Sequence, residues 1–468
     1  MRHTFCLLDL LDSSAGPGIL AREARRSRRE GVTASTAIGG RQRRDWWRTL
    51  HPTARTLMAT RFLRSIGQGA LVVDFVLYLE ALHWNAVTIG ALLTGAGLGG
   101  TALMLGSGTL SDRFGRRPFL LGYQLATAVG ALALVLDPRS WILVLSTVLL
   151  GCGRGANGAA GPFGPVEHAW LAQSVPPADR GQVFSLNGAL GFWGMGLGAW
   201  LGAAVPLLGH LLPGPSAYRP LFALSLVIAV VNLLQVASIR GADLVRRPAP
   251  AGEAAAARNA ATAGPADAPV RRRENVAMAL LTAVNSVNAL GIGLFSPLLV
   301  YWLSVRYGVG SAAIGSTYAV ALILTGVSSV MVGEMTTRIG IVRSVVWVRV
   351  VGVGLLAAMP LMPTYRWAAA IYVVRSIFNR GSAGARQAFG VSLVRDERKG
   401  LASSLNGLSM RLPSALGPAL AGWLMEGGSL DLPFYCAAAL QLAYVVLFGT
   451  VLGRYDRPPA RGVQAASG

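Results

Sequence analysis

The sequence predicts an all-α integral membrane protein with twelve transmembrane helices in two pseudo-symmetric six-helix bundles. Hydrophobic residues make up 53% of the 468 residues, charged residues only 13%, and the mean hydropathy is +0.50. This composition excludes a disordered chain and argues strongly against a soluble enzyme. Apolar segments long enough to span a bilayer recur from Met58 onward, and a polar, arginine-rich stretch divides them into six and six.

Changes in composition along the sequence predict its domains. Residues 1–55 are polar and arginine-rich, and we expect a disordered cytoplasmic tail. The two bundles are expected at 56–240 and 276–453, with a cytoplasmic linker at 241–275 whose Pro- and Ala-rich composition is typical of flexible connections, and a cytoplasmic tail at 454–468. The expected spans are 58–80, 87–110, 118–136, 141–172, 182–205, 219–240, 276–303, 312–336, 342–362, 367–393, 401–425 and 432–452.

The arginine distribution predicts the orientation. The net charge is +21, and Lys399 is the only lysine among the 42 basic residues. Basic residues crowd the loops that lie inside if the N-terminus is inside, whereas the outer loops hold only about four arginines. We therefore expect a multi-pass protein of the plasma membrane with both termini cytoplasmic, and we interpret the charge as loop arginine rather than as a nucleic-acid surface.

The sequence offers no motif for a metal, a cofactor or nucleotide hydrolysis. Cys6, Cys152 and Cys436 are far apart, the five histidines show no metal-ligand spacing, and no GxxxxGK[ST] loop occurs. We expect no metal, no cofactor and no enzymatic activity.

The two halves repeat each other weakly. The segment GQVFSLNG at 181–188 opens the fifth span, and GLASSLNG at 400–407 opens the eleventh, 219 residues later. Duplicated six-helix halves are typical of transporters, in which the substrate binds between the repeats near the middle of the membrane.

The segment GTLSDRFGRR at 108–117 resembles the signature loop of the major facilitator superfamily, GxLxDRxGRR, and it lies between the second and third spans as in that family. The matching residues are Gly108, Asp112, Arg113, Gly115, Arg116 and Arg117. The resemblance covers about residues 58–455 and implies two bundles that rock about a central cavity. At a helix end, Asp112 can hold arginines and a facing helix N-terminus in one state of the transporter, and the glycines permit a tight turn.

A second segment, LGCGRGANG at 150–158, resembles the fourth-span motif LxxxRxxQG of proton-coupled drug antiporters, with Asn157 in place of the usual Gln. The alternative is a glycine-rich packing seam with one arginine. Arg154 lies near mid-span, where an arginine costs about 2.5–3.5 kcal/mol unless it faces a cavity or a carboxylate. Two features depart from that subfamily, because the fifth span lacks the usual GPxxGG hinge and the first span lacks the usual proline pair.

Polar residues inside the spans are the candidate site residues. Asp74 lies 13 residues past Arg61, about 20 Å along the helix, and we expect it to be the proton-coupling carboxylate with Arg154 as its partner. The alternative is that Asp74 only bonds neighbouring helices. Glu167 and His168 are interpreted as a pair on the cytoplasmic surface. The expected substrate-cavity residues are Gln68, Asn157, Asn187, Asn285, Asn288, Arg375, Asn379 and Arg411.

These observations favour a secondary active transporter that works as a monomer in the lipid bilayer and exports small, drug-like molecules in exchange for protons. An alternative is a proton-coupled importer of a metabolite, and the arginines of the second half would then suggest an anionic substrate. A membrane enzyme such as an acyltransferase is an alternative from another class, but no histidine has an acidic residue four or five positions later inside a span. A sensor that binds its ligand without transporting it is a further alternative.

Overall fold

The computed structural model describes residues 50–136, 140–150, 163–176, 179–209, 211–239, 268–339, 341–381, 394–395 and 398–452. Within these residues the regular secondary structure is helical throughout, which confirms the predicted all-α fold. The chain divides into two units, Met1–Arg55 and Thr56–Gly468. The predicted N-terminal tail as far as residue 49, most of the predicted linker and the C-terminal tail lie outside the described residues.

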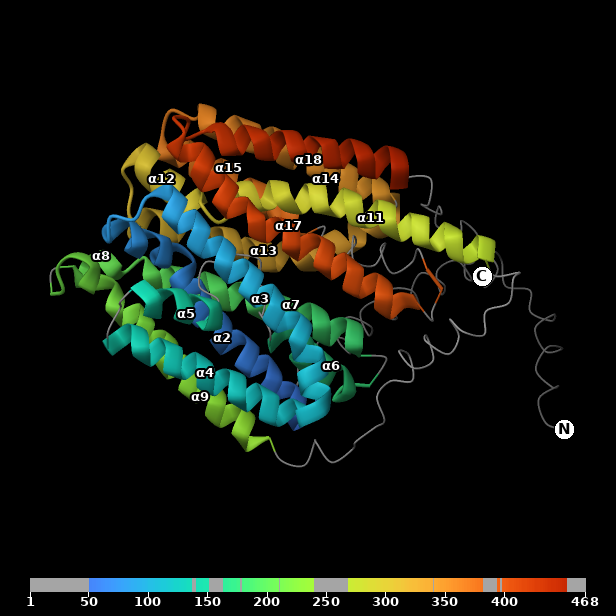
Figure 1. Cartoon of the computed structure of the whole chain (residues 1–468), viewed down its shortest axis with the longest axis horizontal. Coiled ribbons are helices and arrows are strands. Elements are labelled where there is room, and N and C mark those ends of the chain that lie inside the picture. Colours follow the sequence, from blue (N-terminus) through green and yellow to red (C-terminus); the bar gives the residue numbers. More distant parts are fainter. Residues whose placement is uncertain are drawn as a thin grey trace, which may run out of the picture. The chain divides into compact units, whose positions relative to one another are not determined.

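The first half of the chain, as far as Ile239, holds long helices joined by short connections (Figure 1). The predicted fourth span corresponds to two described helices, and residues 151–162 between them lie outside the described residues. The elements are α2 (Pro52–Ala81), α3 (Ala86–Phe114), α4 (Arg116–Leu136), α5 (Ser140–Leu150), α6 (Phe163–Gln173), α7 (Arg180–Gly202), α8 (Val205–Leu208), η1 (Gly214–Tyr218) and α9 (Arg219–Ser238).

The second half, from Ala268, follows the same plan. The predicted seventh span is divided here into two helices, α11 and α12, by a short turn. The elements are α11 (Ala268–Phe295), α12 (Leu299–Tyr307), α13 (Ser311–Ile339), α14 (Ile341–Ala358), η3 (Met359–Leu361), α15 (Tyr365–Gly381), α17 (Lys399–Glu426) and α18 (Leu432–Val451). Each predicted span overlaps a described helix, and eight helical stretches of the described residues are long and apolar enough to cross a membrane.

Local sequence explains where α3 begins and ends. Asn85 precedes its first turn, and its Oδ1 accepts a hydrogen bond from the Thr88 backbone N–H at 3.0 Å, which satisfies one of the free donors of the helix. After Phe114 the chain turns at Gly115, whose φ of 91° favours glycine. This turn lets α4 start at the next residue, so that the end of α3 and the start of α4 stay close together.

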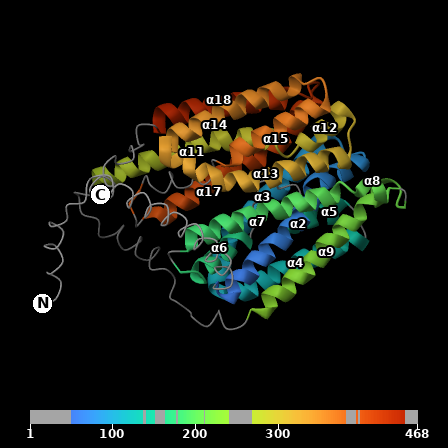
Figure 2. The same ribbon diagram turned by 180° about the vertical axis from the view of Figure 1, so that it is seen from behind.

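Two helix pairs join the halves. α3 packs along α17, and α7 packs along α13; each pair runs side by side in both views (Figures 1 and 2). Inside the first half α4 packs against α9, and inside the second half α11 packs against both α17 and α18. α7 also packs against α2, where Gly198 faces the Ile66 carbonyl and Gly202 faces the Asp74 carboxylate so closely that a Cβ at either glycine would overlap them.

Candidate functional site

Among the described residues, the hydrogen bonds between the two halves lie toward one end of the helices. This end holds Ala81, Ala86, Gly202 and Ser311, and the arginine bias predicts that it faces outward. We call it the predicted outer end.

Along α3 and α17 the helices approach each other closely at three glycines. A Cβ added at Gly90 would overlap the Pro418 carbonyl oxygen, and one added at Gly97 would lie 2.9 Å from the Ala415 Cβ. Gly422 faces the Ala86 carbonyl in the same way. Small residues are what permit helices to approach so closely in a membrane.

Among the residues that the structure describes, three hydrogen bonds cross between the halves at the predicted outer end. The Ala419 backbone N–H donates to Thr94 Oγ1 at 2.9 Å. Asn85 Nδ2 donates to Glu426 Oε1 at 2.7 Å, and Ser304 Oγ donates to Glu80 Oε1 at 3.1 Å. These bonds and the backbone contacts hold the halves together at this end in the described conformation.

Asp74 lies at this junction. It is seven residues before the end of α2, about 10 Å along the helix. Its side chain is 1% exposed, and in the described part of the chain neither carboxylate oxygen has a donor at hydrogen-bonding geometry. Its neighbours are Gly202 of α7, Ser311 of α13 and Tyr218 of η1. The expected partner Arg154 lies outside the described residues, so that pairing stays a prediction.

A buried ion pair occupies the inside of the first half. Glu167 of α6 is fully buried and pairs with Arg64 of α2, and Asn187 Nδ2 of α7 donates to Glu167 Oε1 at 3.1 Å. The Arg64 guanidinium also lies over the Phe163 ring, 3.8 Å from its centroid. The interpretation of Glu167 and His168 as a surface pair is therefore wrong for Glu167, because only His168 is exposed.

Sequence reasoning missed Arg64, although a signal for it was present. Arg61 and Arg64 are three residues apart inside a predominantly apolar helix, and both are buried. An arginine within a membrane span needs a partner, and a buried carboxylate on a neighbouring helix is the usual one. Asn187, an expected substrate-cavity residue, is part of this network.

The second half contains a polar network on α11, α14 and α17. Asn285 Nδ2 donates to Asn406 Oδ1 at 2.6 Å. Arg349 Nη1 of α14 donates to Asn288 Oδ1 at 3.2 Å, and Arg349 is only 2% exposed. Asn406 and Asn187 occupy equivalent positions of the 219-residue repeat, and each amide bonds to a polar side chain of another helix in its own half.

Arg375 of α15 belongs to a second buried polar group in the second half. Its Nη2 donates to Gln441 Oε1 at 3.1 Å and its Nε donates to the Gly352 carbonyl at 3.2 Å, while Asn379 packs against the same glycine. The other expected cavity residues lie elsewhere: Arg411 is partly exposed on α17, Asn157 is outside the described residues, and Gln68 lines a pocket within the first half.

The signature loop ties three helices of the first half together. Arg116 donates to the side chain of Gln173 and, at 3.4 Å, to the Ala169 carbonyl near the end of α6. Arg117 Nη2 donates to the Ala237 carbonyl at the end of α9 at 2.6 Å. Cations are favoured at helix C-termini, where carbonyls lack partners. Arg113 is exposed, and the burial of Gly108 and the side chain of Asp112 lie outside what the structure describes.

We expect Asp112→Asn to slow transport by about tenfold or more while leaving protein abundance nearly unchanged. Asp112 lies in the last turn of α3, and a carboxylate that pairs with basic groups in one state only biases the equilibrium between states. Initial transport rates normalised to protein amount provide the measurement. Rates equal to those of the wild type in Asp112→Asn would remove this role.

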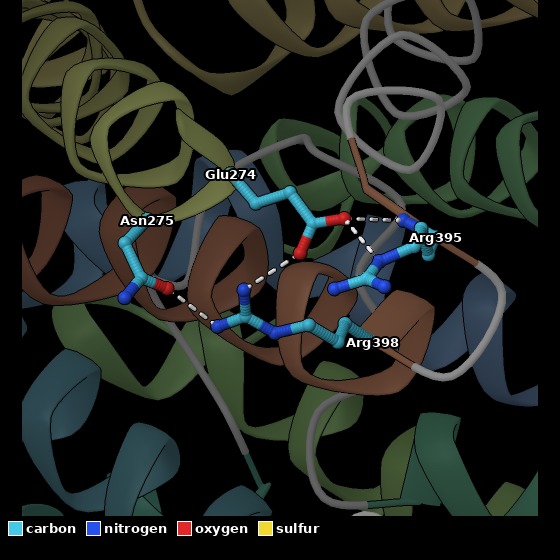
Figure 3. A network of polar contacts seen from close by, with 4 residues as sticks. All are labelled: Glu274, Asn275, Arg395 and Arg398. Carbon is cyan, nitrogen blue, oxygen red and sulfur yellow. Dashed lines mark hydrogen bonds and ion pairs between the residues drawn. The ribbon is translucent and has the colours of Figure 1, made fainter. Parts of the chain in front are cut away.

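A third polar cluster ties the start of α11 to the segment before α17 (Figure 3). Glu274 Oε1 accepts from Arg395 Nε at 3.0 Å, and Glu274 Oε2 accepts from Arg398 Nη1 at 2.8 Å. Arg398 Nη2 donates to Asn275 Oδ1 at 2.6 Å. This cluster was not predicted, because its residues are about 120 positions apart. Within the described residues no group of three or more His, Cys, Asp or Glu residues is placed to hold a metal ion.

The family model of the Major Facilitator Superfamily matches this chain in two segments, residues 57–285 and 281–468. Similar proteins include an uncharacterized MFS-type transporter, YdeE, of Escherichia coli K12, with 28% identity over 35% of this chain and 40% of the relative. The multidrug resistance protein MdtH of Cronobacter sakazakii is 29% identical over 30% of this chain and 38% of the relative. These matches therefore span about two fifths of each relative.

Solved structures agree at the level of the fold. A mutant of the nucleoside transporter NupG superposes with a TM-score of 0.66 at 11% identity, covering 85% of this chain and 98% of that chain. A D-xylose-proton symporter superposes with a TM-score of 0.62 at 12% identity, covering 85% and 97%.

Proposed function

Because the chain belongs to the Major Facilitator Superfamily, we propose that it is a secondary active transporter that exports small amphipathic molecules in exchange for protons. The observation that carries the proposal is the junction at the predicted outer end. There the two halves, whose sequences repeat each other weakly, meet through close contacts at glycines and, among the described residues, three hydrogen bonds. Such a junction can open and re-form as two bodies rock about a site between them.

In this proposal the rocking bodies are residues 56–240 and 276–453. The protein acts as a monomer in the plasma membrane, with both termini and the connecting segment in the cytoplasm. The arginine bias of the loops supports this orientation.

Export is favoured by the names of several relatives. Besides MdtH, a class C tetracycline resistance protein of Escherichia coli is 35% identical over 27% of this chain and 28% of the relative. These names describe the relatives, and the short matches make export a proposal for this chain. A substrate-panel assay in proteoliposomes under an imposed pH gradient tests it, with drug-like cations and neutral amphiphiles accumulating against their gradients as the expected result.

Asp74 is our candidate for the coupling carboxylate, with Arg154 as its partner. An ionised carboxylate with no donor is destabilised in an apolar interior. Because Asp74 lies where α2, α7 and α13 meet, opening of the predicted outer end would bring water and protons to it. Proton binding at Asp74 and the position of the halves would then be linked, as proton exchange requires.

We expect Asp74→Asn to abolish flux driven by a pH gradient while downhill exchange of substrate continues. The asparagine keeps the size of the side chain but binds no exchangeable proton. The measurement compares gradient-driven accumulation and counterflow in the same proteoliposomes. Asp179→Asn is the matched control, because Asp179 precedes α7 without a capping hydrogen bond and should retain both activities. Unchanged gradient-driven accumulation in Asp74→Asn would remove Asp74 from the mechanism.

A proton-coupled importer of an anionic metabolite is the second candidate. The buried Arg349 and Arg375 place positive charge inside the second half and favour it, and a D-xylose transporter of Levilactobacillus brevis, 39% identical over 21% of this chain and 19% of the relative, shows that the sequence relatives include more than exporters. The direction of net flux separates the two. Cells without the protein would retain more of an exported compound, or would lose uptake of an imported one.

A further inference from the structure

A polar pocket lies inside the first half, between α2, α4 and α9, away from the junction of the halves. These three helices run side by side in both views (Figures 1 and 2). The pocket is narrow: it offers about 50 Å³ to the centres of water-sized molecules, which is room for several waters or for one slender ligand. We call it the α2–α4–α9 pocket. Its lining includes Arg64, Gln68, Leu71, Gln124, Ile228 and Asn232.

The lining residues form one face of each helix. On α2 they are spaced as Arg64, Gln68 and Leu71, and on α9 Ile228 and Asn232 are four residues apart, which is the spacing of neighbours on one helix face. The opposite faces of α4 and α9 expose large apolar residues such as Leu125 and Leu234, as lipid-facing surfaces do. The polar side chains are therefore turned into the protein and away from the bilayer.

Several of these buried polar atoms have no hydrogen-bond partner among the described residues. Asn232 is 0% exposed, yet neither its Nδ2 nor its Oδ1 is bonded. Gln124 is 1% exposed with Nε2 unbonded, and Arg64 is 8% exposed with Nε and Nη1 unbonded. Leaving a buried polar group unpaired costs about 1–3 kcal/mol, so a molecule that supplied the missing partners would bind with that advantage.

The chemistry of these atoms specifies the ligand. The unbonded groups are mostly donors, and the strongest belong to a guanidinium, whose natural partner is a planar or tetrahedral oxyanion. Leu71 and Ile228 supply an apolar wall beside them. One turn closer to the predicted inner end, Thr60 Oγ1 donates to Gln235 Oε1 at 3.2 Å and links α2 to α9 below the pocket.

We propose that the α2–α4–α9 pocket binds an oxyanion head group that carries a short apolar tail. Arg64, Gln124 and Asn232 hold the head group, and Leu71 and Ile228 contact the tail. Arg64 can keep its ion pair with Glu167 through Nη2 and still offer Nε and Nη1 to the ligand. The site is separate from the junction of the halves and does not depend on the direction or coupling of transport.

Binding of hexanoate to the full-length protein in phosphatidylcholine nanodiscs tests the proposal by calorimetry. Hexanoate is expected to bind, and hexanamide and hexylammonium to bind at least about tenfold more weakly, because they lack the negative charge. Asn232→Leu is expected to weaken hexanoate binding about tenfold to a hundredfold, as loss of a hydrogen bond to a charged group would. Since this substitution removes an unpartnered buried amide, we expect the variant to fold.

Thr147→Val is the matched control, because the Thr147 hydroxyl of α5 is buried and bonded to the Leu143 carbonyl outside the pocket. It should bind hexanoate as the wild type does. A second arm adds phosphatidylglycerol to the nanodiscs: weaker hexanoate binding in the wild type would identify a lipid phosphate as an occupant of the pocket, and unchanged binding would assign the pocket to free acids. The proposal is overturned if the wild type does not bind hexanoate, or if Asn232→Leu binds it with unchanged affinity.

Discussion

Replacing Gly90 with valine is expected to reduce transport by about ten- to a hundredfold while leaving a folded protein. A Cβ at this position would overlap the Pro418 carbonyl oxygen of α17, and backbone cannot turn aside as a side chain can. Overpacking of this kind costs about 1–3 kcal/mol. The cost falls only on the state in which the predicted outer end is closed, so the equilibrium shifts toward the open state.

The measurement combines transport rate with labelling of a cysteine placed at Thr94, in a background whose three native cysteines are replaced with serine. A membrane-impermeant maleimide should label Thr94→Cys faster when Gly90→Val is present, because the α3–α17 contact opens. Gly95→Val is the matched control: it lies on the same helix, but nothing lies within 4 Å of its Cβ position. Equal labelling and transport in Gly90→Val and Gly95→Val would show that the α3–α17 contact does not take part in the transport cycle.

Replacing Glu167 with glutamine is expected to lower the free energy of unfolding by about 3–5 kcal/mol. The substitution leaves the Arg64 guanidinium buried without its carboxylate, and an uncompensated buried charge is strongly destabilising. The double variant Arg64→Met/Glu167→Met should recover most of the loss, since an apolar pair of similar volume replaces both charges.

Thermal or detergent-induced unfolding of the wild type, Glu167→Gln and the double variant measures these differences in stability. Arg306→Gln serves as the control, because the Arg306–Asp431 pair is separated by 3.4 Å and its side chains are 37% and 26% exposed. A partly exposed pair of that kind contributes about 1 kcal/mol or less. If Glu167→Gln were no less stable than Arg306→Gln, the buried Arg64–Glu167 pair would contribute no more to stability than the partly exposed pair does.

The helices could be predicted well from the sequence because they follow from apolar length alone. Each predicted span overlaps a described helix, although residues 382–393 of the predicted tenth span lie outside the described residues. The fourth span is matched only at its two ends, by α5 and α6, since its glycine-rich centre at 151–162 lies outside the described residues.

The site was predicted less well, because hydropathy along one chain does not reveal which helix faces which. Glu167 was interpreted as a surface residue since it follows an apolar stretch near a predicted inner end. It is buried because Arg64, about 100 residues earlier, meets it across α2 and α6. The α2–α4–α9 pocket was missed for the same reason: Gln124 and Asn232 lie on helices that are adjacent only in the folded protein.

The character of the α3–α17 contact bears on how fast the protein can cycle. Helices that meet through interlocked side chains must withdraw each knob from its socket before they separate, and that step forms an activation barrier. Gly90 and Gly422 instead meet backbone carbonyls, and Gly97 meets the Cβ of Ala415, so no long side chain is interlocked at these positions. The rate of separation should therefore depend mainly on the hydrogen bonds to α17, so that turnover can be tuned at Asn85 and Thr94 without repacking either half.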